Sequence, residues 1–136
     1  MLRNRSIPNT TVIPELPYDD VNQAADWLCV AFGFTVRLRI GNHRCQINIG
    51  EGAMVAIERQ PGRTDVGHVM VRVENIDRHC ERARAHGAVI SREPADYPYG
   101  ERQYNATDIG GHRWTFTQSI ADSDPRDWGG TPVQLT

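Results

Sequence analysis

The chain has 136 residues, of which 39% are hydrophobic, 24% charged and 7% aromatic, a composition typical of a globular protein with a buried core. Its formal net charge of −2 argues against nucleic-acid binding, because domains that bind nucleic acids normally carry a basic excess on one face. Every basic residue is an arginine and none is a lysine, so Schiff-base and lysine-nucleophile chemistry is excluded.

The first half of the chain predicts a strand, a helix and three more strands. The alternating run at 11–16 indicates the first strand. The helix is expected over Val21–Phe32, because apolar residues recur at helical spacing between the capping candidates Asp19 and Asp20 and a terminating Gly33. Three further apolar-alternating runs follow, the first two joined by a Gly-Asn pair that suits a tight hairpin; they are 34–40, 43–49 and 53–58.

The second half repeats this order. A strand at 67–73 precedes a helix from Asn75 to His86, which is capped by Asn75 or Asp77 and stopped by Gly87. Gly33 and Gly87 lie 54 positions apart, so one supersecondary unit is used twice. The last three strands are expected at 88–93, 101–107 and 112–118.

These elements predict an α+β protein built of two βαβββ modules in tandem, each a curved mixed sheet with one helix behind it and a concave cleft lined by the sheets. The modules are expected at about 11–60 and 66–119, which together form one domain over 11–119. A short extension (1–10) precedes the domain. The tail (120–136) is rich in Asp, Gly and Pro, with one helical turn expected near Pro125.

Cysteine usage and hydropathy favour a cytoplasmic protein. The three cysteines form no CxxC pair and no regular pattern, which argues against a disulfide framework and a zinc knuckle. No apolar signal region is visible near residue 1, and no run of about 18 apolar residues occurs. We expect neither export nor a membrane partner.

Strand alternation predicts which side chains line the cleft. Valines 69, 71 and 73 are assigned to the helix-packed face, as are Trp114 and Phe116, and the same is expected of Val55 and Ile57. The side chains expected to line the cleft and bind a ligand are therefore Met54, His68, Met70, Arg72, Arg102, Tyr104, Arg113 and Thr115, together with Glu58. Such a lining suits a small molecule with anionic or hydrogen-bonding groups.

Three segments carry a resemblance to a known superfamily: "YDDVNQAADWLCVAFGF", "GHVMVRVENIDRHCERARAHGA" and "YGERQYNATDIGGHRWTFTQ". Over residues 11–119 the chain resembles the vicinal oxygen chelate superfamily, and most of all its glyoxalase and bleomycin-resistance-like group. The resemblance implies a cleft that in many members forms between two chains, so a homodimer is expected.

The resemblance also implies where a metal would bind. In metal-using members the ligands come from the first and last strands of each module, and these positions are Ile13, Glu58, His68 and Thr115 here. The repeat is expected to make Ile13 the equivalent of His68 in the other module, and Glu58 the equivalent of Thr115. Because isoleucine cannot bind a divalent ion and a threonine hydroxyl is a poor ligand, only two of the four positions suit a metal. A typical catalytic site has three protein ligands, so Glu15 or a residue of a partner chain would have to complete the set.

Three functions follow for testing. The favoured hypothesis is a metal-independent protein that binds a small aromatic or antibiotic-like molecule and needs no cofactor. The alternative is a glyoxalase-like lyase or isomerase, or a dioxygenase, in which Glu58 and His68 hold a divalent Zn, Ni, Mn or Fe ion and Glu58 serves as a catalytic base. The third is a metal-free enzyme with Glu58 as general base near His68.

Overall fold

The computed structural model describes residues 2–133 as two sheets and two main helices, in the order that the repeat predicts. The elements of the first module are β1 (Glu15–Tyr18), α1 (Val21–Phe32), β2 (Thr35–Ile40), β3 (Arg44–Ile49) and β4 (Gly52–Glu58). Those of the second are β5 (His68–Arg72), α2 (Ile76–Ala85), β6 (Val89–Tyr97), β7 (Glu101–Thr107) and β8 (Arg113–Ser119), followed by the 3₁₀ helix η1 (Pro125–Trp128).

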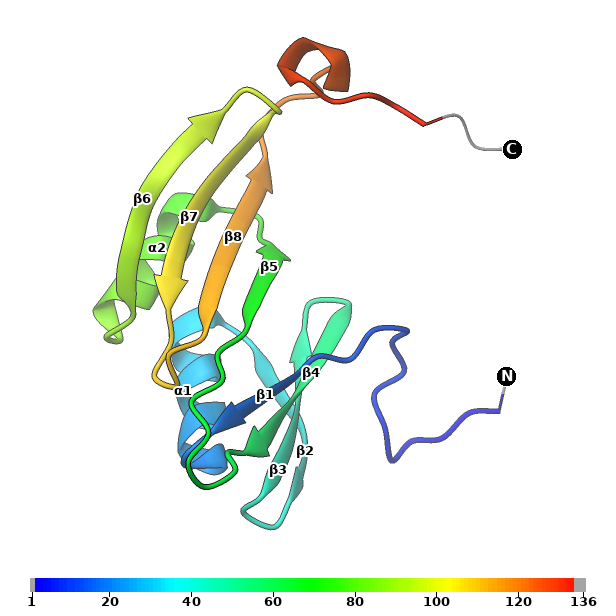
Figure 1. Ribbon diagram of the computed structural model, residues 1–136, viewed down its shortest axis with the longest axis vertical. Helices are drawn as coiled ribbons and strands as arrows, with labels where there is room; N and C mark the ends of the chain where they lie inside the picture. The colour runs from blue at the N-terminus through cyan, green and yellow to red at the C-terminus, as the bar shows by residue number, and fades with distance from the viewer. Residues whose placement is uncertain (1, 134–136) are drawn as a thin grey trace.

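Each module forms one mixed sheet of four strands. Sheet A has the order β1-β4-β3-β2, and sheet B has the order β5-β8-β7-β6. The first strand of each module pairs in parallel with the last, and the other pairs are antiparallel. Helix α2 lies behind sheet B, whose other side carries no helix (Figure 1). The predicted α+β class with tandem βαβββ modules is confirmed.

The helix ends follow the residues that sequence reasoning singled out. Asp20 caps α1 by accepting a hydrogen bond from the Gln23 amide, and Gly33 ends the helix in the left-handed conformation, with φ of 80°. Asn75 caps α2 through the amide of Arg78. These caps fix where each helix enters and leaves its sheet.

The two modules share one hydrophobic core. Phe32 at the end of α1 packs edge-on against Trp114 and Phe116 of β8, with ring centroids 5.5 and 4.8 Å apart. Phe34 also contacts Trp114, and the Arg82 guanidinium of α2 donates to the carbonyls of Val30 and Cys29 at the end of α1. The second sheet is therefore held in place by the first helix as well as by its own.

A buried polar junction also joins the modules. One oxygen of Asp108 accepts from the Tyr18 hydroxyl at 2.6 Å and from the Trp114 indole at 2.9 Å, while the other accepts from the amides of Gly110 and His112. The His112 ring accepts from the Gly67 amide and donates to the Pro17 carbonyl. His112 is thus a structural residue that ties the start of β8 to both modules.

Two sequence predictions about strands are wrong. β1 begins at Glu15 rather than at residue 11. In β4, Met54 and Ala56 pack into the core opposite Ile47 and Cys45 of β3, so Val55 and its neighbour at position 57 take the face away from α1. Because 53–57 are all apolar, alternation alone could not decide between the two faces.

No helix within residues 2–133 is both long enough and apolar enough to cross a membrane.

Candidate functional site

The side of sheet B that faces away from α2, here called the open face of sheet B, is predominantly polar. The alternation of β5, β7 and β8 and their register place on it His68, Met70, Arg72, Glu101, Gln103, Asn105, Arg113, Thr115, Thr117 and Ser119. Although no helix covers this face (Figure 1), Gln103, Thr115 and Thr117 are only 4%, 5% and 4% exposed. They form a floor beneath longer side chains on either side.

His68 takes part in a hydrogen-bonded chain across this floor. Its Nε2 lies 2.8 Å from the Thr115 hydroxyl, and that hydroxyl donates to Asn105 Oδ1 at 2.9 Å. Because the only hydroxyl proton of Thr115 points to Asn105, His68 must be the donor through Nε2. The hydrogen bond to Thr115 orients the imidazole ring, and Nδ1 is the ring nitrogen that takes no part in this chain.

A second chain centres on Glu101. Thr117 donates to Glu101 Oε1 at 2.6 Å and accepts from the Gln103 amide, while the Arg72 guanidinium contacts the same carboxylate oxygen at 3.3 Å. Burial acts to raise the pKa of Glu101, but hydrogen bonds from Ser119 and Thr117 and the charge of Arg72 outweigh it and lower that pKa. The carboxylate is therefore ionised and its charge is balanced by Arg72.

Two groups on this face are available to another molecule. Arg113 is exposed, and its guanidinium has no hydrogen-bond or ion-pair partner among residues 2–133. Met70 on the edge strand β5 is 63% exposed. A guanidinium and an exposed thioether on the same face suit a ligand that has an anionic or carbonyl group and an apolar body.

An apolar groove of about 1170 Å³, here called the inter-module groove, lies between β5 and the turn that joins β3 to β4. It runs from the irregular segment that precedes β1 to the end of β8. Its lining is mostly aliphatic and includes Val12, Pro14, Ile49, Met54, Val69, Val71 and Val73, with Arg72, Glu51 and Glu74 also contributing.

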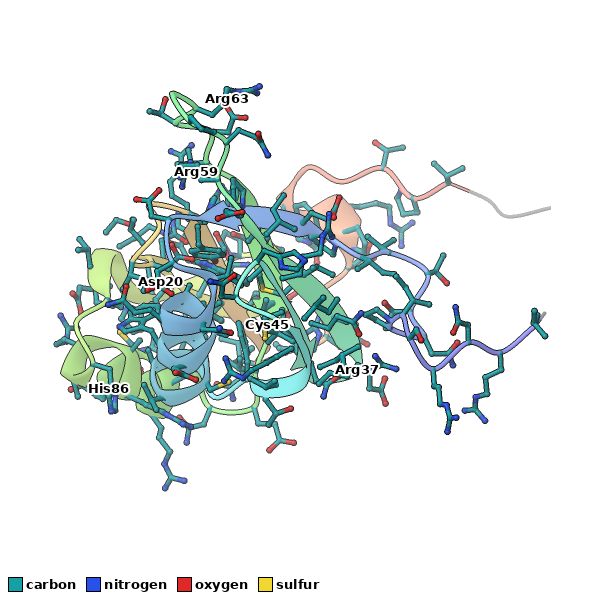
Figure 2. The ribbon with its side chains drawn as sticks, turned by 90° about the horizontal axis from the view of Figure 1, so that it is seen from below. Asp20, Arg37, Cys45, Arg59, Arg63 and His86 are labelled. Carbon is teal, nitrogen blue, oxygen red and sulfur yellow. The ribbon has the colours of Figure 1, made fainter. Side chains whose placement is uncertain are left out.

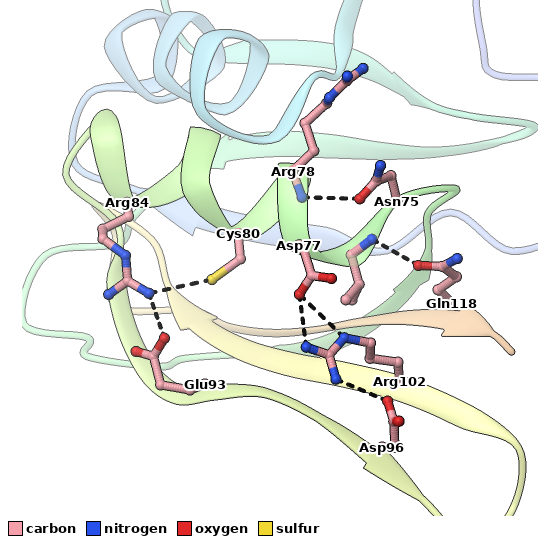
Figure 3. A network of polar contacts seen from close by, with 10 residues as sticks. Asn75, Asp77, Arg78, Cys80, Arg84, Glu93, Asp96, Arg102 and Gln118 are labelled. Atoms are coloured by element: carbon pink, nitrogen blue, oxygen red, sulfur yellow. Dashed lines mark hydrogen bonds and ion pairs between the residues drawn. The ribbon is translucent and has the colours of Figure 1, made fainter.

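Two residues predicted to line the cleft, Tyr104 and Arg102, face α2, and a third, Met54, lies largely in the core. Tyr104 is fully buried on the α2 side of sheet B, where its hydroxyl contacts His79 Nδ1 at 2.5 Å. Arg102 also points toward α2 and binds Asp77 and Asp96, each at 2.9 Å (Figure 3). Met54 is 1% exposed in the core, at the inner end of the inter-module groove. The cleft placement of Tyr104 and Arg102 is therefore corrected.

Glu58 is also placed differently from the prediction. It is exposed at the end of β4 and shares the alternation of Met54 and Ala56, which point toward α1. The parallel strand pairs show which residues correspond in the two modules. Glu15 of β1 pairs with Val55 of β4, and Met70 of β5 pairs in the same way with Thr115 of β8. Val55, and not Glu58, is the counterpart of Thr115. The predicted equivalence was wrong because it was read from strand ends rather than from strand register.

Sequence reasoning missed three of the residues that organise the floor: Glu101, Gln103 and Asn105. A signal was present, since "ERQYNAT" alternates Glu, Gln and Asn with Arg, Tyr and Ala. Once Tyr104 is assigned to the core, the other set must face away from the helix. Within residues 2–133, no three His, Cys, Asp or Glu side chains gather closely enough to hold a metal ion.

Comparison with known proteins agrees with this architecture. A family model described as the Glyoxalase/Bleomycin resistance protein/Dioxygenase superfamily matches residues 9–116. The chain belongs to this superfamily.

Solved structures of the superfamily resemble the chain over most of its length. TioX from Micromonospora sp. ML1 is 32% identical, with 85% of this chain and 100% of TioX covered and a TM-score of 0.70. TnmS3, an antibiotic binding protein from Streptomyces sp. CB03234, is 18% identical, with 82% and 99% covered and a TM-score of 0.65. A glyoxalase/bleomycin resistance protein/dioxygenase from Nocardioides is 20% identical, with 93% and 89% covered and a TM-score of 0.63. No curated protein matches the chain.

Proposed function

We propose that this superfamily member binds a small aromatic or antibiotic-like molecule without a metal and makes or breaks no bond in it. The observation that carries the proposal is that His68 Nε2 and Glu101 on the open face of sheet B are already hydrogen-bonded to neighbouring side chains. Arg113 and Met70, by contrast, face outward. The binding of an antibiotic by TnmS3, which shares the fold, supports the same proposal.

The donor groups on the open face do not fit a divalent metal. Such a site needs about three imidazole, thiolate or carboxylate ligands with one open position. His68 Nε2 is engaged by Thr115, and the repeat places Ile13, which precedes β1, and Val55 of β4 at the equivalent positions of the first module. Glu58 leaves its strand on the other face. We therefore derive no catalytic step through a metal.

Elemental analysis of protein purified without chelator tests this proposal against the metalloenzyme alternative. We expect well under 0.1 equivalents of Zn, Ni, Mn and Fe. A stoichiometric metal that is lost in both Glu58→Gln and His68→Ala would instead establish the alternative, a metal-dependent lyase, isomerase or dioxygenase.

A defined aromatic anion tests the binding site. We expect naphthalene-2-carboxylate to bind and Arg113→Ala to weaken its binding about tenfold or more, because a charge-assisted hydrogen bond contributes about 1.5–3 kcal/mol. Isothermal titration gives the affinities. Arg78→Ala is the matched control, since Arg78 is an exposed arginine of α2 on the far side of sheet B. Equal losses in both variants would contradict a specific role for Arg113.

We also propose that a second copy of this chain fills the inter-module groove. The outer edges of β1 and β5 carry no strand partner in sheets A and B, and an unpaired edge beside apolar surface favours association. Val12 and Met70 at the groove are 73% and 63% exposed. A two-fold dimer would cover the same groove and the same edge on both copies.

A further inference from the structure

The side of sheet A that faces away from α1, here called the open face of sheet A, is occupied by the chain itself. Residues 5–8, here called the strap, lie against it. Gln46 Nε2 of β3 donates to the Ser6 carbonyl at 2.9 Å, and Arg37 Nη2 of β2 donates to the Arg5 carbonyl at 2.9 Å. Pro8 is buried. In Figure 2 sheet A separates α1 from this segment, and Arg37 lies on the segment's side.

The two donors form a pre-arranged pair. Arg37 Nη1 also donates to Gln46 Oε1, so the Gln46 amide group can only present its nitrogen to the strap. Gln46 is 3% exposed, which fixes its direction. The pair therefore offers two N–H groups aimed at two consecutive main-chain carbonyls, and neither donor contacts a strap side chain through these bonds.

Recognition of this kind reads amide carbonyls rather than a particular residue. Any molecule that presents two adjacent amide carbonyls with an apolar ring nearby offers the same two acceptors as Arg5 and Ser6, together with a ring in place of Pro8. The strap lies outside the residues that the family model matches, 9–116, whereas both donors lie within them.

We propose that Arg37 and Gln46 form a binding site for peptide-like ligands on the open face of sheet A, and that the strap is its intramolecular occupant. A ligand with consecutive amide carbonyls binds there by displacing residues 5–8. The inference adds a ligand class to the proposed small-molecule function and rests on that function only for the claim that such a ligand is the natural one. The site itself can be tested without it.

Arg44 supplies a matched control. It lies on the same face of sheet A, where it pairs with Glu15 at 2.9 Å and does not contact the strap. In the intact protein, Arg37→Ala and Gln46→Ala should each speed tryptic cleavage after Arg5 at least fivefold, because the bound backbone is released. Arg44→Ala should leave that rate unchanged. Mass spectrometry follows the cleavage. Equal cleavage rates in the parent protein and all three variants would overturn the proposal.

A peptide titration tests the site directly. The probe is fluorescein-labelled Arg-Ser-Ile-Pro-amide, added to the full chain and to a variant lacking residues 2–9 whose folding is checked by thermal melting. We expect at least tenfold tighter binding to the truncated chain, and loss of that gain in truncated Arg37→Ala but not in truncated Arg44→Ala. Absence of millimolar binding, or equal binding to the full and truncated chains, would refute the site. If the truncated chain does not fold, the cleavage rates decide.

The two proposals fail separately. Loss of the peptide site would leave naphthalene-2-carboxylate binding at Arg113 untouched, because Arg113 lies on sheet B. Conversely, a protein that binds the peptide and no aromatic anion would keep the strap site and lose the function proposed for the open face of sheet B.

Discussion

Asp108 accepts hydrogen bonds from four donors with one buried carboxylate, and one of these donors, the Tyr18 hydroxyl, belongs to the other module. Removing it leaves buried N–H and O–H groups without partners, at about 1–3 kcal/mol each. We expect Asp108→Ala to lower the free energy of unfolding by roughly 3 kcal/mol or more, measured by urea denaturation. Asp65→Ala, which breaks an exposed ion pair with Arg63, should cost less than about 1 kcal/mol.

His79 makes stability depend on pH. Burial lowers its pKa below the usual value of about 6.5, and the neutral ring donates to the Phe32 carbonyl while accepting from the Tyr104 hydroxyl. As pH falls below about 6.5, His79 binds a proton in the unfolded chain but stays neutral in the folded chain, so the free energy of unfolding decreases. The loss stops at the lower folded-state pKa.

The expected slope from this residue is at most about 1.4 kcal/mol per pH unit within that window. Urea denaturation between pH 7.5 and 5 should therefore show a smaller decline for His79→Gln than for the parent protein. Parallel declines would show that His79 is not responsible. The partial burial of His79 comes from its contacts with Phe116 and Tyr104 of sheet B and with Phe32 of the other module.

Single residues also show where sequence reasoning ends. His68, Met70, Arg72, Arg113 and Thr115 lie on the predicted face because valines and aromatic residues alternate with them clearly. Whether any of them contacts a ligand stays a prediction, as does the role of Glu58. Tyr104 was misplaced because tyrosine suits both a core and a binding surface, and only its neighbours in the fold decide.

At the scale of elements, the turn from β6 to β7 holds the tail in place. Gly100 has φ of 81°, and a Cβ there would lie 2.4 Å from the Ala121 carbonyl oxygen. Its own carbonyl accepts from the amides of Ile120 and Ala121. Beyond this point Trp128 of η1 packs against Tyr99. The conformation and the close approach both require glycine.

We expect Gly100→Ala to release the tail, since backbone atoms at 2.4 Å cannot yield as a side chain can. The melting temperature should fall, and hydrogen exchange at residues 120–130 should rise. Gly50→Ala is the comparison, because Gly50 also has a positive φ but nothing lies within 4 Å of its Cβ position. If both variants exchange alike, backbone conformation alone explains the effect.

Elements were predicted well where the pattern is one-sided and poorly where it is not. Both helices match, because caps and glycines mark their ends and one face is apolar. The faces of β4 were reversed because the residues on both of its faces are apolar. β1 was placed too early because Pro14 has no N–H group to donate to a neighbouring strand.

At the scale of the molecule, the proposed dimer can be broken at one edge. Met70→Glu would put a charge into the covered groove, so we expect a monomer by light scattering coupled to size exclusion. Val89→Glu is the matched control, since Val89 lies on the edge strand β6, at 64% exposure against 63% for Met70. A monomeric parent protein would reject the dimer.

The arrangement of the whole molecule was beyond sequence reasoning. The repeat predicted two modules, but no periodicity indicates that Phe32 of one packs on Trp114 of the other, or that residues 5–8 lie against sheet A. Such contacts depend on how elements distant in the sequence meet, which local patterns do not encode.

Both modules contribute to the hydrogen bonds of Asp108 and to the aromatic core, so non-covalent contacts hold them together in addition to the covalent chain. The loop from β4 to β5 projects from the body, with Arg63 near its tip (Figure 2), while Tyr18–Asp108 and Arg82–Val30 bonds span the modules elsewhere. The polypeptide could be severed at Arg63 and its halves would stay together. Two fragments, 1–63 and 64–136, should then reassemble from separate solutions into one particle, with neither half folding alone.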